Sequence, residues 1–442
     1  METVCVVGLG YIGLPTAIVF ALNGKHVVGV DTNPEVVELL HQGKIHIEEP
    51  GLQDACAKVL QEGRLVVSER PVPADAFVIT VPTPLNHETN EADLSYVERA
   101  TESLLPVLKK GDLVVLESTV PPGTVEEVMI PILQKSGLDP YEDLWVVHSP
   151  ERVIPGNILY ELEHNSRIVG GMNRESALKG KELYSSFVKG DILITDAKTA
   201  ELTKLVENTF RDVNIALANE LAIICSELGV NVWEVRRLAN YHPRVNLLSP
   251  GPGVGGHCIP IDPWFVIGAS PIFTRLIRTA RTVNEEMPKR VCQFVETLMS
   301  KPGEGNIAVL GVAYKADVDD VRESPALRII DILVKQGYTV KAYDPHVKGT
   351  YKGKVNTLED ALTDMDLAIV TTDHAEFRCL TPEYVKRLAR NPVVMDTRNM
   401  LDSRDFGNAG VLVYTLGNGK QLGKSQLSYA EAASASDGAW QV

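Results

Sequence analysis

The stretch GPGVGGHCIPIDPW, residues 251–264, places one cysteine and one histidine in a run of glycines and prolines. Such a run cannot lie inside a helix or a strand, because proline lacks an N–H donor and glycine restrains the backbone poorly, so it predicts a tight loop. Gly255 and Gly256 would let the backbone approach a bound group closely. On these residues alone, two interpretations of Cys258 stay open, a nucleophilic thiol and a structural cysteine. A third, metal ligation with His257, needs more ligands than this region offers, so the sequence predicts no metal.

A second segment with chemical meaning is the glycine loop GLGYIG, residues 8–13, which fits the pattern G-x-G-x-x-G. It follows an apolar strand, opens a helix, and is followed about 20 residues later by Asp31 at the end of the next strand, as dinucleotide binding requires. In that interpretation Gly8 allows the turn, Gly10 lets the backbone approach a pyrophosphate, and Gly13 lets the helix pack on the strand. Asp31 favours NAD over NADP, because its carboxylate would repel a 2′-phosphate. The alternative is a Rossmann-like domain that holds another ligand or none.

An NAD site and a nucleophilic thiol in one chain suggest a definite reaction. A thiol adds to an aldehyde to give a thiohemiacetal, hydride loss then gives a thioester, and water hydrolyses the thioester to an acid. The pair therefore predicts oxidation from the aldehyde to the acid level.

Strands must alternate with helices to position these two loops. Apolar runs of strand length recur through the first part of the chain, with helical patterns such as 94–111 between them, which predicts a parallel, doubly wound sheet. A second alternating segment starts near Asn306. Each half has a strand ending in glycine, a helix, and a strand ending in aspartate, Asp31 or Asp344, which indicates a fold-level repeat without a second full glycine fingerprint.

Between the two halves the sequence is helical. Residues 199–229 carry apolar side chains at three- and four-residue spacing without internal glycine or proline, which predicts one long helix or two in tandem, and a further helix is expected from near Ile272. The predicted fold class is α/β, with an N-terminal Rossmann domain, a central helical dimerisation domain and a C-terminal Rossmann-like domain. The predicted boundaries are 1–196, 197–300 and 301–420, and 421–442 is expected to be a disordered tail.

Composition narrows the classes of partner. The chain has 442 residues and a formal net charge of −15, which argues against general binding of nucleic acid or anionic membranes. It shows neither an apolar run long enough to span a membrane nor a secretory signal. The six scattered cysteines include no C-x-x-C pair, which fits reduced thiols in a cytoplasmic protein.

Several separated motifs resemble the UDP-glucose/GDP-mannose dehydrogenase family. In chain order, these motifs are GLGYIG at 8–13, VPTP at 81–84, ESTVPPGT at 117–124, SPERVIPG at 149–156, KLVENTFRDVNIALANE at 204–220, GVGGHCIPIDP at 253–263 and GVAYKADVDDVRESPA at 311–326. The resemblance covers Val4 to about Arg398 and implies oxidation of the primary alcohol of a UDP-sugar to a uronic acid with two NAD. KIHIEEP at 44–50 and NYHPRVN at 240–246 are typical of the branch that acts on UDP-N-acetyl-D-mannosamine; the branch that acts on UDP-N-acetyl-D-glucosamine shares much of GGHCIPIDP.

The resemblance also implies residue roles. Cys258 matches the nucleophile, Lys204 and Asn208 the residues beside the reacting oxygen, and Asp262 a carboxylate that acts with Lys204 in base catalysis through a water. Thr119 and Glu151 match the residues that position that water. The implied cofactor contacts are Gly8, Gly10, Tyr11, Ile12, Gly13, Asp31, Thr83, Thr119 and Arg322. The implied substrate contacts are Arg152, Val153, Lys204, Asn208, Arg211, His242, Arg244, Gly255, His257, Tyr314 and Lys315. The family further implies a homodimer, or a higher oligomer built on it, in which Arg244 reaches the partner's active site, and an active site in the cleft between the domains.

Two positions depart from the UDP-glucose pattern. Pro155 stands where those enzymes commonly carry a second glutamate, and Ile261 where they carry a lysine, and both differences argue against UDP-glucose as the substrate. Plainer interpretations also remain: Lys204 as a solvated helix lysine, Asp262 as a turn residue between prolines, and His257 as a residue that shapes the loop. A simple hydroxyacid dehydrogenase with one hydride transfer, and an NAD-sensing binding protein without activity, are the alternatives at the level of function.

Overall fold

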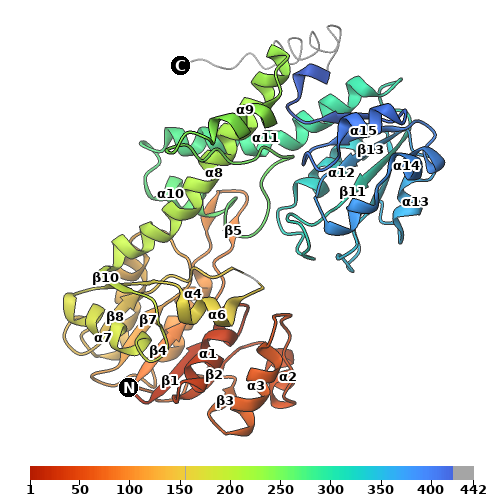
Figure 1. The fold of residues 1–442 in the computed structure, drawn as a ribbon. Coiled ribbons are helices and arrows are strands. Elements are labelled where there is room, and N and C mark those ends of the chain that lie inside the picture. The colour runs from red at the N-terminus through yellow and green to blue at the C-terminus, as the bar shows by residue number, and fades with distance from the viewer. Residues whose placement is uncertain (155, 422–442) are drawn as a thin grey trace. The chain divides into compact units, whose positions relative to one another are not determined.

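The computed structural model describes residues 1–154 and 156–421, and the predicted tail from 421 onward therefore lies almost wholly outside the described residues. The chain forms two compact units (Figure 1). The first comprises residues 1–207 and 264–273, and the second comprises residues 208–263 and the chain from 274 onward. The predicted three-domain boundaries stay a prediction, because the long central helix belongs to both units.

The first unit is built on an eight-stranded sheet in the order β10-β9-β8-β7-β4-β1-β2-β3. All neighbouring strands are parallel except β8 and β9, which are antiparallel. The chain order reverses between β1 and β4, which is the place where open α/β sheets bind ligands at the carboxyl ends of their strands. The strands are β1 (Thr3–Val7), β2 (His26–Val30), β3 (Leu65–Ser68), β4 (Ala76–Ile79), β7 (Leu113–Leu116), β8 (Trp145–His148), β9 (Arg167–Gly171) and β10 (Ile192–Asp196); β5 (Leu85–Asn86) and β6 (Glu91–Ala92) form a separate hairpin.

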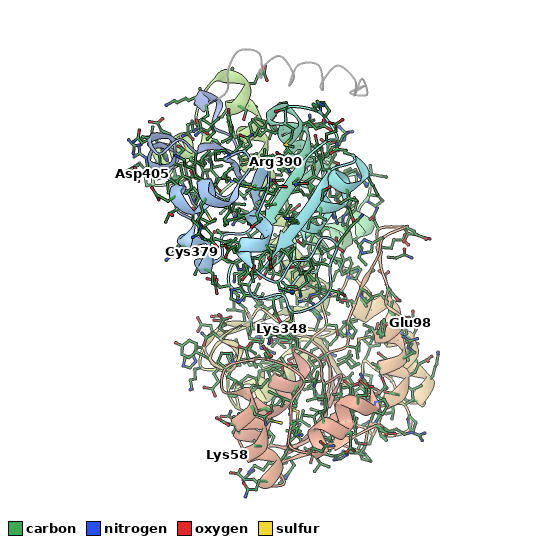
Figure 2. All side chains as sticks on the ribbon, turned by 90° about the vertical axis from the view of Figure 1, so that its right-hand side faces the viewer. Lys58, Glu98, Lys348, Cys379, Arg390 and Asp405 are labelled. Atoms are coloured by element: carbon green, nitrogen blue, oxygen red, sulfur yellow. The ribbon has the colours of Figure 1, made fainter. Side chains whose placement is uncertain are left out.

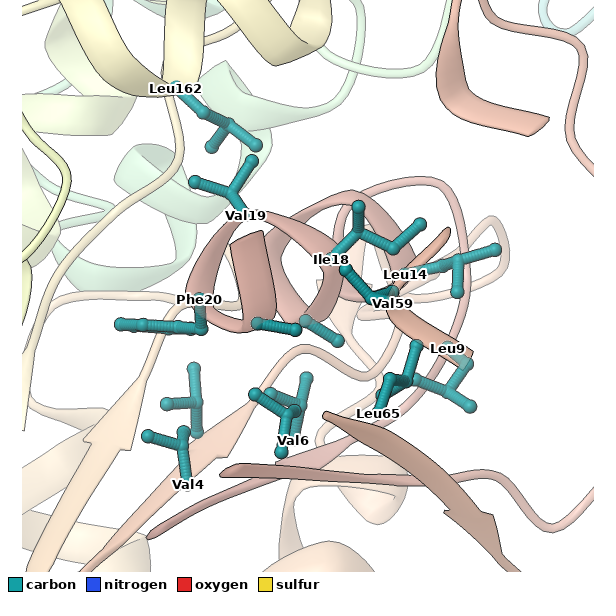
Figure 3. Close-up of a cluster of buried hydrophobic side chains, with 14 of the residues drawn as sticks. Val4, Val6, Leu9, Leu14, Ile18, Val19, Phe20, Val59, Leu65 and Leu162 are labelled. Atoms are coloured by element: carbon teal, nitrogen blue, oxygen red, sulfur yellow. The ribbon is translucent and has the colours of Figure 1, made fainter. Parts of the chain in front are cut away.

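Helix α1 (Gly13–Leu22) packs its apolar side chains on this sheet. Leu14, Ile18 and Phe20 are fully buried, and Figure 3 shows them in one cluster with Val4 and Val6 of β1, in which Phe20 lies near Val4 and Leu14 and Ile18 lie near Val59. Nearly every residue of α1 is buried, which explains why its sequence lacks the polar face of a surface helix. The other helical segments of this unit are α2 (Pro34–His41), α3 (Leu52–Gln61), α4 (Ser95–Leu104), α5 (Ile130–Leu133), α6 (Ile158–His164) and α7 (Arg174–Tyr184).

The second unit contains a five-stranded, fully parallel sheet in the order β12-β11-β13-β14-β15. Its strands are β11 (Asn306–Leu310), β12 (Thr339–Tyr343), β13 (Leu367–Val370), β14 (Val393–Asp396) and β15 (Leu412–Thr415). Its helices are α12 (Pro325–Lys335), α13 (Leu358–Leu362), α14 (Pro382–Leu388) and α15 (Ser403–Asn408). The expected α/β class with two parallel sheets is confirmed.

The predicted repeat extends to individual hydrogen bonds. Gly8 and Gly311 both follow the first strand of their sheet with φ near +95° and +93°, and each donates its N–H to the strand beside it at 2.8 Å. Thr80 donates its hydroxyl to Gly8 O at 2.7 Å, and Thr371 donates to Gly311 O at 2.5 Å. The turn after the first strand is therefore held by equivalent hydrogen bonds in both halves, although their glycine fingerprints differ.

The helical region consists of α8 (Ala197–Leu228), α9 (Val232–Ala239), α10 (Asp262–Ala269) and α11 (Arg275–Leu298). Residues 197–228 form one helix of 32 residues, not two in tandem. The helix expected from near Ile272 begins at Arg275 instead, and it continues through the buried Pro288 to Leu298. A proline can be accommodated there because burial of the surrounding helix face outweighs the lost hydrogen bond.

The end of the described chain returns to this helical region within the second unit. Val232 N–H donates to Gly417 O at 2.9 Å, and Gly419 N–H donates to Val230 O at 2.8 Å. A Cβ on Gly419 would lie 2.3 Å from Cys225 O, so only glycine fits against the end of α8. Residues 416–419 therefore complete the packing around α8 and α9.

Charged side chains cover the outside of both units. Figure 2 labels five exposed examples, Lys58 and Glu98 in the first unit and Lys348, Arg390 and Asp405 in the second, together with the exposed Cys379. None of the helices in the described part of the chain is both long and apolar enough to cross a membrane.

Candidate active site

The glycine loop shows which of its glycines the protein itself requires. A Cβ on Gly13 would lie 1.8 Å from Gly8 O and 2.3 Å from Thr80 Oγ1, so helix α1 could not start there with any other residue. Gly8 needs its φ of +95°. At Gly10 an added Cβ would meet no atom within 4 Å, so nothing in the fold demands glycine. Close approach of a pyrophosphate would demand it, and the loop with the start of α1 fits such an anion.

Asp31 links the end of β2 to this loop. Its Oδ2 accepts the Leu9 N–H at 2.8 Å and its Oδ1 accepts the Asn33 N–H at 2.8 Å. Both oxygens keep a further lone pair, so the half-buried carboxylate can also accept a ribose hydroxyl. Nearby, Tyr11 is 40% exposed and donates its hydroxyl to Glu49 at 3.1 Å, and Ile12 precedes α1. These residues fit an NAD ribose and pyrophosphate, and their contacts to the cofactor stay predictions.

Thr83 and Thr119 lie beyond the carboxyl ends of β4 and β7 and are bonded to each other. The Thr83 hydroxyl donates to Thr119 O at 2.6 Å. The two strands are neighbours in the sheet, so this bond joins their loops at the edge where the glycine loop also lies.

Glu151 lies in a buried ion pair. Its Oε2 accepts Arg167 Nη2 at 2.6 Å, and its Oε1 accepts the Arg152 N–H at 2.5 Å. Arg167 also donates to Glu117 at 2.7 Å, and Tyr184 donates to the same oxygen at 2.5 Å. Burial raises the pKa of Glu117, although Arg167 opposes this, and the two carboxylates raise the pKa of Arg167 against its burial. The predicted role of Glu151 in positioning a water stays open, but its first role is to hold Arg167.

Arg152 is engaged inside the first unit. Its guanidinium donates to Glu207 at 3.1 Å and 2.7 Å and to Ser166 O at 3.0 Å. These bonds use three of its five N–H groups, so a diphosphate would meet a guanidinium that is already paired with Glu207. Val153 is half-buried against the core of the first unit, so a substrate contact there would come from its backbone.

In the second unit, the loop around Cys258 is held by its neighbours. Gly256 N–H donates to Arg322 O at 2.9 Å, and Cys258 O accepts the N–H groups of Ile261 and Asp262 at 3.1 Å and 2.9 Å. A Cβ on Gly255 would lie 2.6 Å from the Tyr314 side chain, and one on Gly256 would lie 2.9 Å from it. The two glycines were expected to serve the approach of a bound group, but contact with Tyr314 already explains them. The Cys258 side chain is exposed at the tip of this loop.

Asn208 on α8 binds Asp262 near the end of this loop, and both side chains are buried. Asn208 Nδ2 donates to Asp262 Oδ2 at 2.6 Å, and the two residues are 7% and 3% exposed. Lys204 precedes Asn208 by one turn on α8, so both point to the same side of that helix. Within the part of the chain that the structure describes, the half-buried Lys204 ammonium has no hydrogen-bond or ion-pair partner.

Charged residues surround the thiol loop. Arg322 donates two hydrogen bonds to the Asp320 carboxylate, from Nε at 3.0 Å and from Nη2 at 2.6 Å. This ion pair adjoins His257, whose pKa is lowered by desolvation and, to a smaller extent, by the charge of Arg322. A lowered pKa favours the neutral imidazole, which suits a hydrogen-bonding or shaping role. Desolvation raises the pKa of Tyr314. The remaining predicted substrate residues, Arg211, His242, Arg244 and Lys315, are exposed.

Comparison with known proteins places these features in a family. The sequence model of the UDP-glucose/GDP-mannose dehydrogenase family, NAD binding domain, matches residues 2–188; the central domain of the same family matches 198–286, and its UDP binding domain matches 308–403. The chain belongs to the UDP-glucose/GDP-mannose dehydrogenase family. NAD as the cofactor and a UDP-binding C-terminal domain follow from this membership.

Other members of the UDP-glucose/GDP-mannose dehydrogenase family are similar over nearly the whole chain. UDP-N-acetyl-D-mannosamine dehydrogenase of Methanococcus aeolicus is 45% identical over 95% of this chain and 96% of its own length. NDP-N-acetyl-D-galactosaminuronic acid dehydrogenase of Ralstonia nicotianae is 47% identical over 91% of this chain and 97% of its own. The solved structure of the UDP-D-ManNAc dehydrogenase of Pyrococcus horikoshii superposes with a TM-score of 0.89 at 43% identity, covering 95% of this chain and all of that one.

Three groups of polar side chains in the two units were not anticipated from the sequence. They are the Glu117–Arg167–Tyr184 cluster, a buried chain of polar side chains through Asn219 and Asn284, and a group of Asp317, His346, His374 and Glu376 beyond the second sheet. In the last group both nitrogens of His374 are engaged, one with Asp344 at 3.0 Å and one with Asp317 N–H at 3.0 Å. No local motif marks these partners, because each bond joins residues from distant parts of the sequence.

Proposed function

We propose that the protein oxidises the C6 primary alcohol of UDP-N-acetyl-D-mannosamine to UDP-N-acetyl-D-mannosaminuronate with two NAD⁺. The names of the relatives from Methanococcus and Pyrococcus support this sugar. The observation that carries the reaction type is the exposed Cys258 on a loop that ends at the buried Asp262–Asn208 pair. A nucleophile must reach solvent and substrate, and its loop must be fixed.

The proposed reaction has three balanced stages. The alcohol loses a hydride to the first NAD⁺ and a proton to give the aldehyde. Cys258 Sγ then bonds to the aldehyde carbon, and the thiohemiacetal loses a hydride to the second NAD⁺ and a proton to give a thioester. Water attacks the thioester, the C–S bond breaks, and the carboxylate leaves with release of the thiol and a further proton. NAD⁺ supplies the hydride acceptor in both oxidations.

The chain's own residues manage charge and protons in these stages. The Lys204 ammonium and the Asn208 amide stabilise the alkoxide and the tetrahedral oxyanions. Asp262, fixed by Asn208, receives the proton of the attacking water in concert with Lys204. Arg211, Arg244 and Lys315 supply exposed positive charge for the diphosphate.

A product count tests the proposal. The protein is incubated with NAD⁺ and a panel of nucleotide sugars, and NADH formed per acid formed is measured. Two NADH per acid with UDP-N-acetylmannosamine as the best substrate supports it; one NADH per turnover indicates a simple dehydrogenase, and tight NAD binding without turnover indicates a sensor. Cys258→Ala should abolish acid formation, and acid formation at the wild-type rate in that variant would contradict the thioester route.

A second candidate substrate is an N-acetylgalactosamine nucleotide, because the Ralstonia relative named NDP-N-acetyl-D-galactosaminuronic acid dehydrogenase is 47% identical. UDP-N-acetylglucosamine is a third member of the panel. The ratio of kcat/KM values among the three sugars decides between them.

We further infer a cytoplasmic homodimer. Its support is a stripe of exposed apolar side chains on α8 within the second unit: Phe210 is 66% exposed, Leu217 50% and Leu228 68%. Spacings of seven and eleven residues, about two and three helical turns, place these side chains on one side of the helix, and an exposed apolar face of this kind marks an interaction surface. A second copy of the chain is its proposed partner, and Arg244 is proposed to serve the partner's site. The six cysteines, all within the described residues, form no disulfide with one another, which agrees with a reducing compartment.

A further inference from the structure

A chain of buried polar side chains leads to the first residue of the thiol loop. Gly251 N–H donates to Asn219 Oδ1 at 2.9 Å, and Asn219 Nδ2 donates to Asn284 Oδ1 at 2.9 Å. Asn284 Nδ2 donates in turn to Asp212 Oδ1 at 2.8 Å and to Asp212 O at 3.0 Å. Asn219 and Asn284 are 0% and 1% exposed, so water does not compete for these bonds.

We call this chain of hydrogen bonds, from Asp212 through Asn284 and Asn219 to Gly251, the relay. An ion pair holds the end of the relay that lies away from the thiol loop. Arg281 Nη1 donates to Asp212 Oδ1 at 2.7 Å, and both residues are almost fully buried. A buried arginine can donate but not accept, and the carboxylate beside it can only accept. The direction of every later bond is therefore fixed: Asn284 must turn its amide nitrogen to Asp212, and Asn219 must turn its own to Asn284, which leaves Asn219 Oδ1 for Gly251.

The other end of the thiol loop is held from the same helix. Asn208 and Asn219 both lie on α8, and their separation of eleven residues is about three turns, so their side chains share one face. Asn219 fixes the loop where it begins, at Gly251, and Asn208 fixes it where it ends, at Asp262. All these residues belong to the second unit.

We infer that Asn219 and Asn284 are positioning residues for the thiol: the relay from Asp212 to Gly251 sets the place of the loop that presents Cys258 to the aldehyde. The inference rests on the proposed role of Cys258 as the nucleophile. The relay touches neither substrate nor cofactor and acts only through the loop. Its loss weakens capture of the aldehyde while the first hydride transfer continues.

The variant Asn219→Asp tests this with almost no change of volume. Its carboxylate can still accept the Gly251 N–H but can no longer donate to Asn284, and the fixed direction of the relay leaves two acceptors facing each other. We expect kcat for acid formation to fall about 100-fold, the effect of misplacing a reacting group by about 1 Å. KM for the nucleotide sugar should stay within about threefold, because the substrate contacts remain.

The decisive reading is the number of NADH formed per acid. If Cys258 is misplaced, aldehyde escapes, so this number rises above two and aldehyde is trapped from the medium with hydroxylamine. A smaller fraction of folded protein would lower both products equally and leave the ratio unchanged. The rate of Cys258 alkylation by iodoacetamide, without substrate, should also change severalfold.

Asn306→Asp is the matched control. Asn306 lies in the same unit and donates its amide to Asp364 O at 2.9 Å, so the same substitution removes a donor away from the thiol loop. A ratio of two and a wild-type alkylation rate in Asn219→Asp would overturn the inference, and so would equal changes in the control. If Asn219→Asp does not fold, Asn219→Ala removes the Gly251 bond without adding charge and is judged by the same readings.

Failure of the proposed function would look different. In that case the wild-type protein itself would not give two NADH per acid. The alkylation rate and the hydrogen exchange of the Gly251 amide would still show whether the relay holds the loop, and unchanged values of both in Asn219→Asp would overturn the relay as well.

Discussion

Each glycine of the GLGYIG loop is glycine for its own reason. Gly13 faces Gly8 O and Thr80 at distances that exclude a side chain, whereas Gly10 faces no protein atom within 4 Å. The fold therefore accounts for Gly13, and only a ligand accounts for Gly10. This difference separates the effect of a substitution on folding from its effect on the cofactor.

We expect Gly10→Ala to keep the wild-type melting temperature but to weaken NAD⁺ binding about tenfold or more, because its methyl group would occupy the approach to the pyrophosphate. Gly13→Ala should also lower the melting temperature, because overpacking typically lowers the free energy of unfolding by roughly 1–3 kcal/mol. Calorimetry of unfolding and titration with NAD⁺ measure the two effects. Unchanged NAD⁺ affinity in Gly10→Ala would contradict the assignment of the cofactor site.

Among the elements, β7, β9 and the loop after β8 are joined by one buried ion cluster. Arg167 on β9 binds Glu117, which follows β7, and Glu151, which follows β8. The guanidinium also lies 4.3 Å from the centre of the Tyr184 ring. Removal of Arg167 leaves two buried carboxylates without a compensating positive charge, which is more damaging than the ion pair itself is stabilising.

Arg167→Met should therefore lower the free energy of unfolding by about 3–5 kcal/mol. Lys179→Met, which breaks the exposed Lys179–Glu182 pair, should change it by less than about 0.5 kcal/mol. Urea unfolding of the two variants beside the wild type makes the comparison. Similar small losses in both would show that the cluster is not the structural element described.

Glu201 on α8 binds the backbone of the segment that follows Pro122. It accepts the N–H groups of Gly123 and Val125 at 2.5 Å and 2.8 Å, and burial raises its pKa from 4.5 to about 7 against those bonds. The folded protein thus holds a proton that the unfolded chain releases. The stability from this group is fully present below pH 4.5 and is lost as the pH rises through about 7.

Glu201→Gln should remove this loss, which amounts to about 3 kcal/mol at most. The free energy of unfolding of the wild type and of the variant is measured from pH 5 to pH 8, and the difference between the two is compared across this range. Burial lowers the pKa of His148 to about 3, so His148 also makes stability depend on pH, but it does so equally in both proteins and cancels in the difference. The variant should gain on the wild type as the pH rises. A difference that does not change with pH would contradict the burial of a proton at Glu201.

The secondary-structure elements differ in how well the sequence predicts them. The strands β1, β4 and β7 are continuous apolar runs of strand length, and that length together with their β-branched residues predicts them. Strand β10 was not predicted, because its side chains are exposed or half-buried and carry no clear pattern. The same holds for the site: the loops around Gly8 and Cys258 are local motifs, whereas Arg167 meets Glu117 across 50 residues and Asn219 meets Asn284 across 65.

At the scale of the whole molecule, the proposed dimer makes a prediction about α8. Phe210→Glu or Leu217→Glu would place a charge in the apolar stripe and should convert the dimer to a monomer. Sedimentation velocity measures the change. Leu412→Glu on β15, where the side chain is 55% exposed outside the stripe, is the control and should leave the assembly intact. A wild-type protein that sediments as a monomer would contradict the dimer.

The return of residues 416–419 to the end of α8 has a consequence for synthesis of the protein on the ribosome. Ala222, Cys225 and Val232 form a small core that Gly417 and Gly419 close. Those glycines are translated almost 200 residues after α8 ends at Leu228, which at 5–20 residues per second is a delay of about 10–40 s. Throughout that interval the nascent chain carries a helical region whose core is still open to solvent. Residues 416–419 thus complete a core that was begun near the middle of the message.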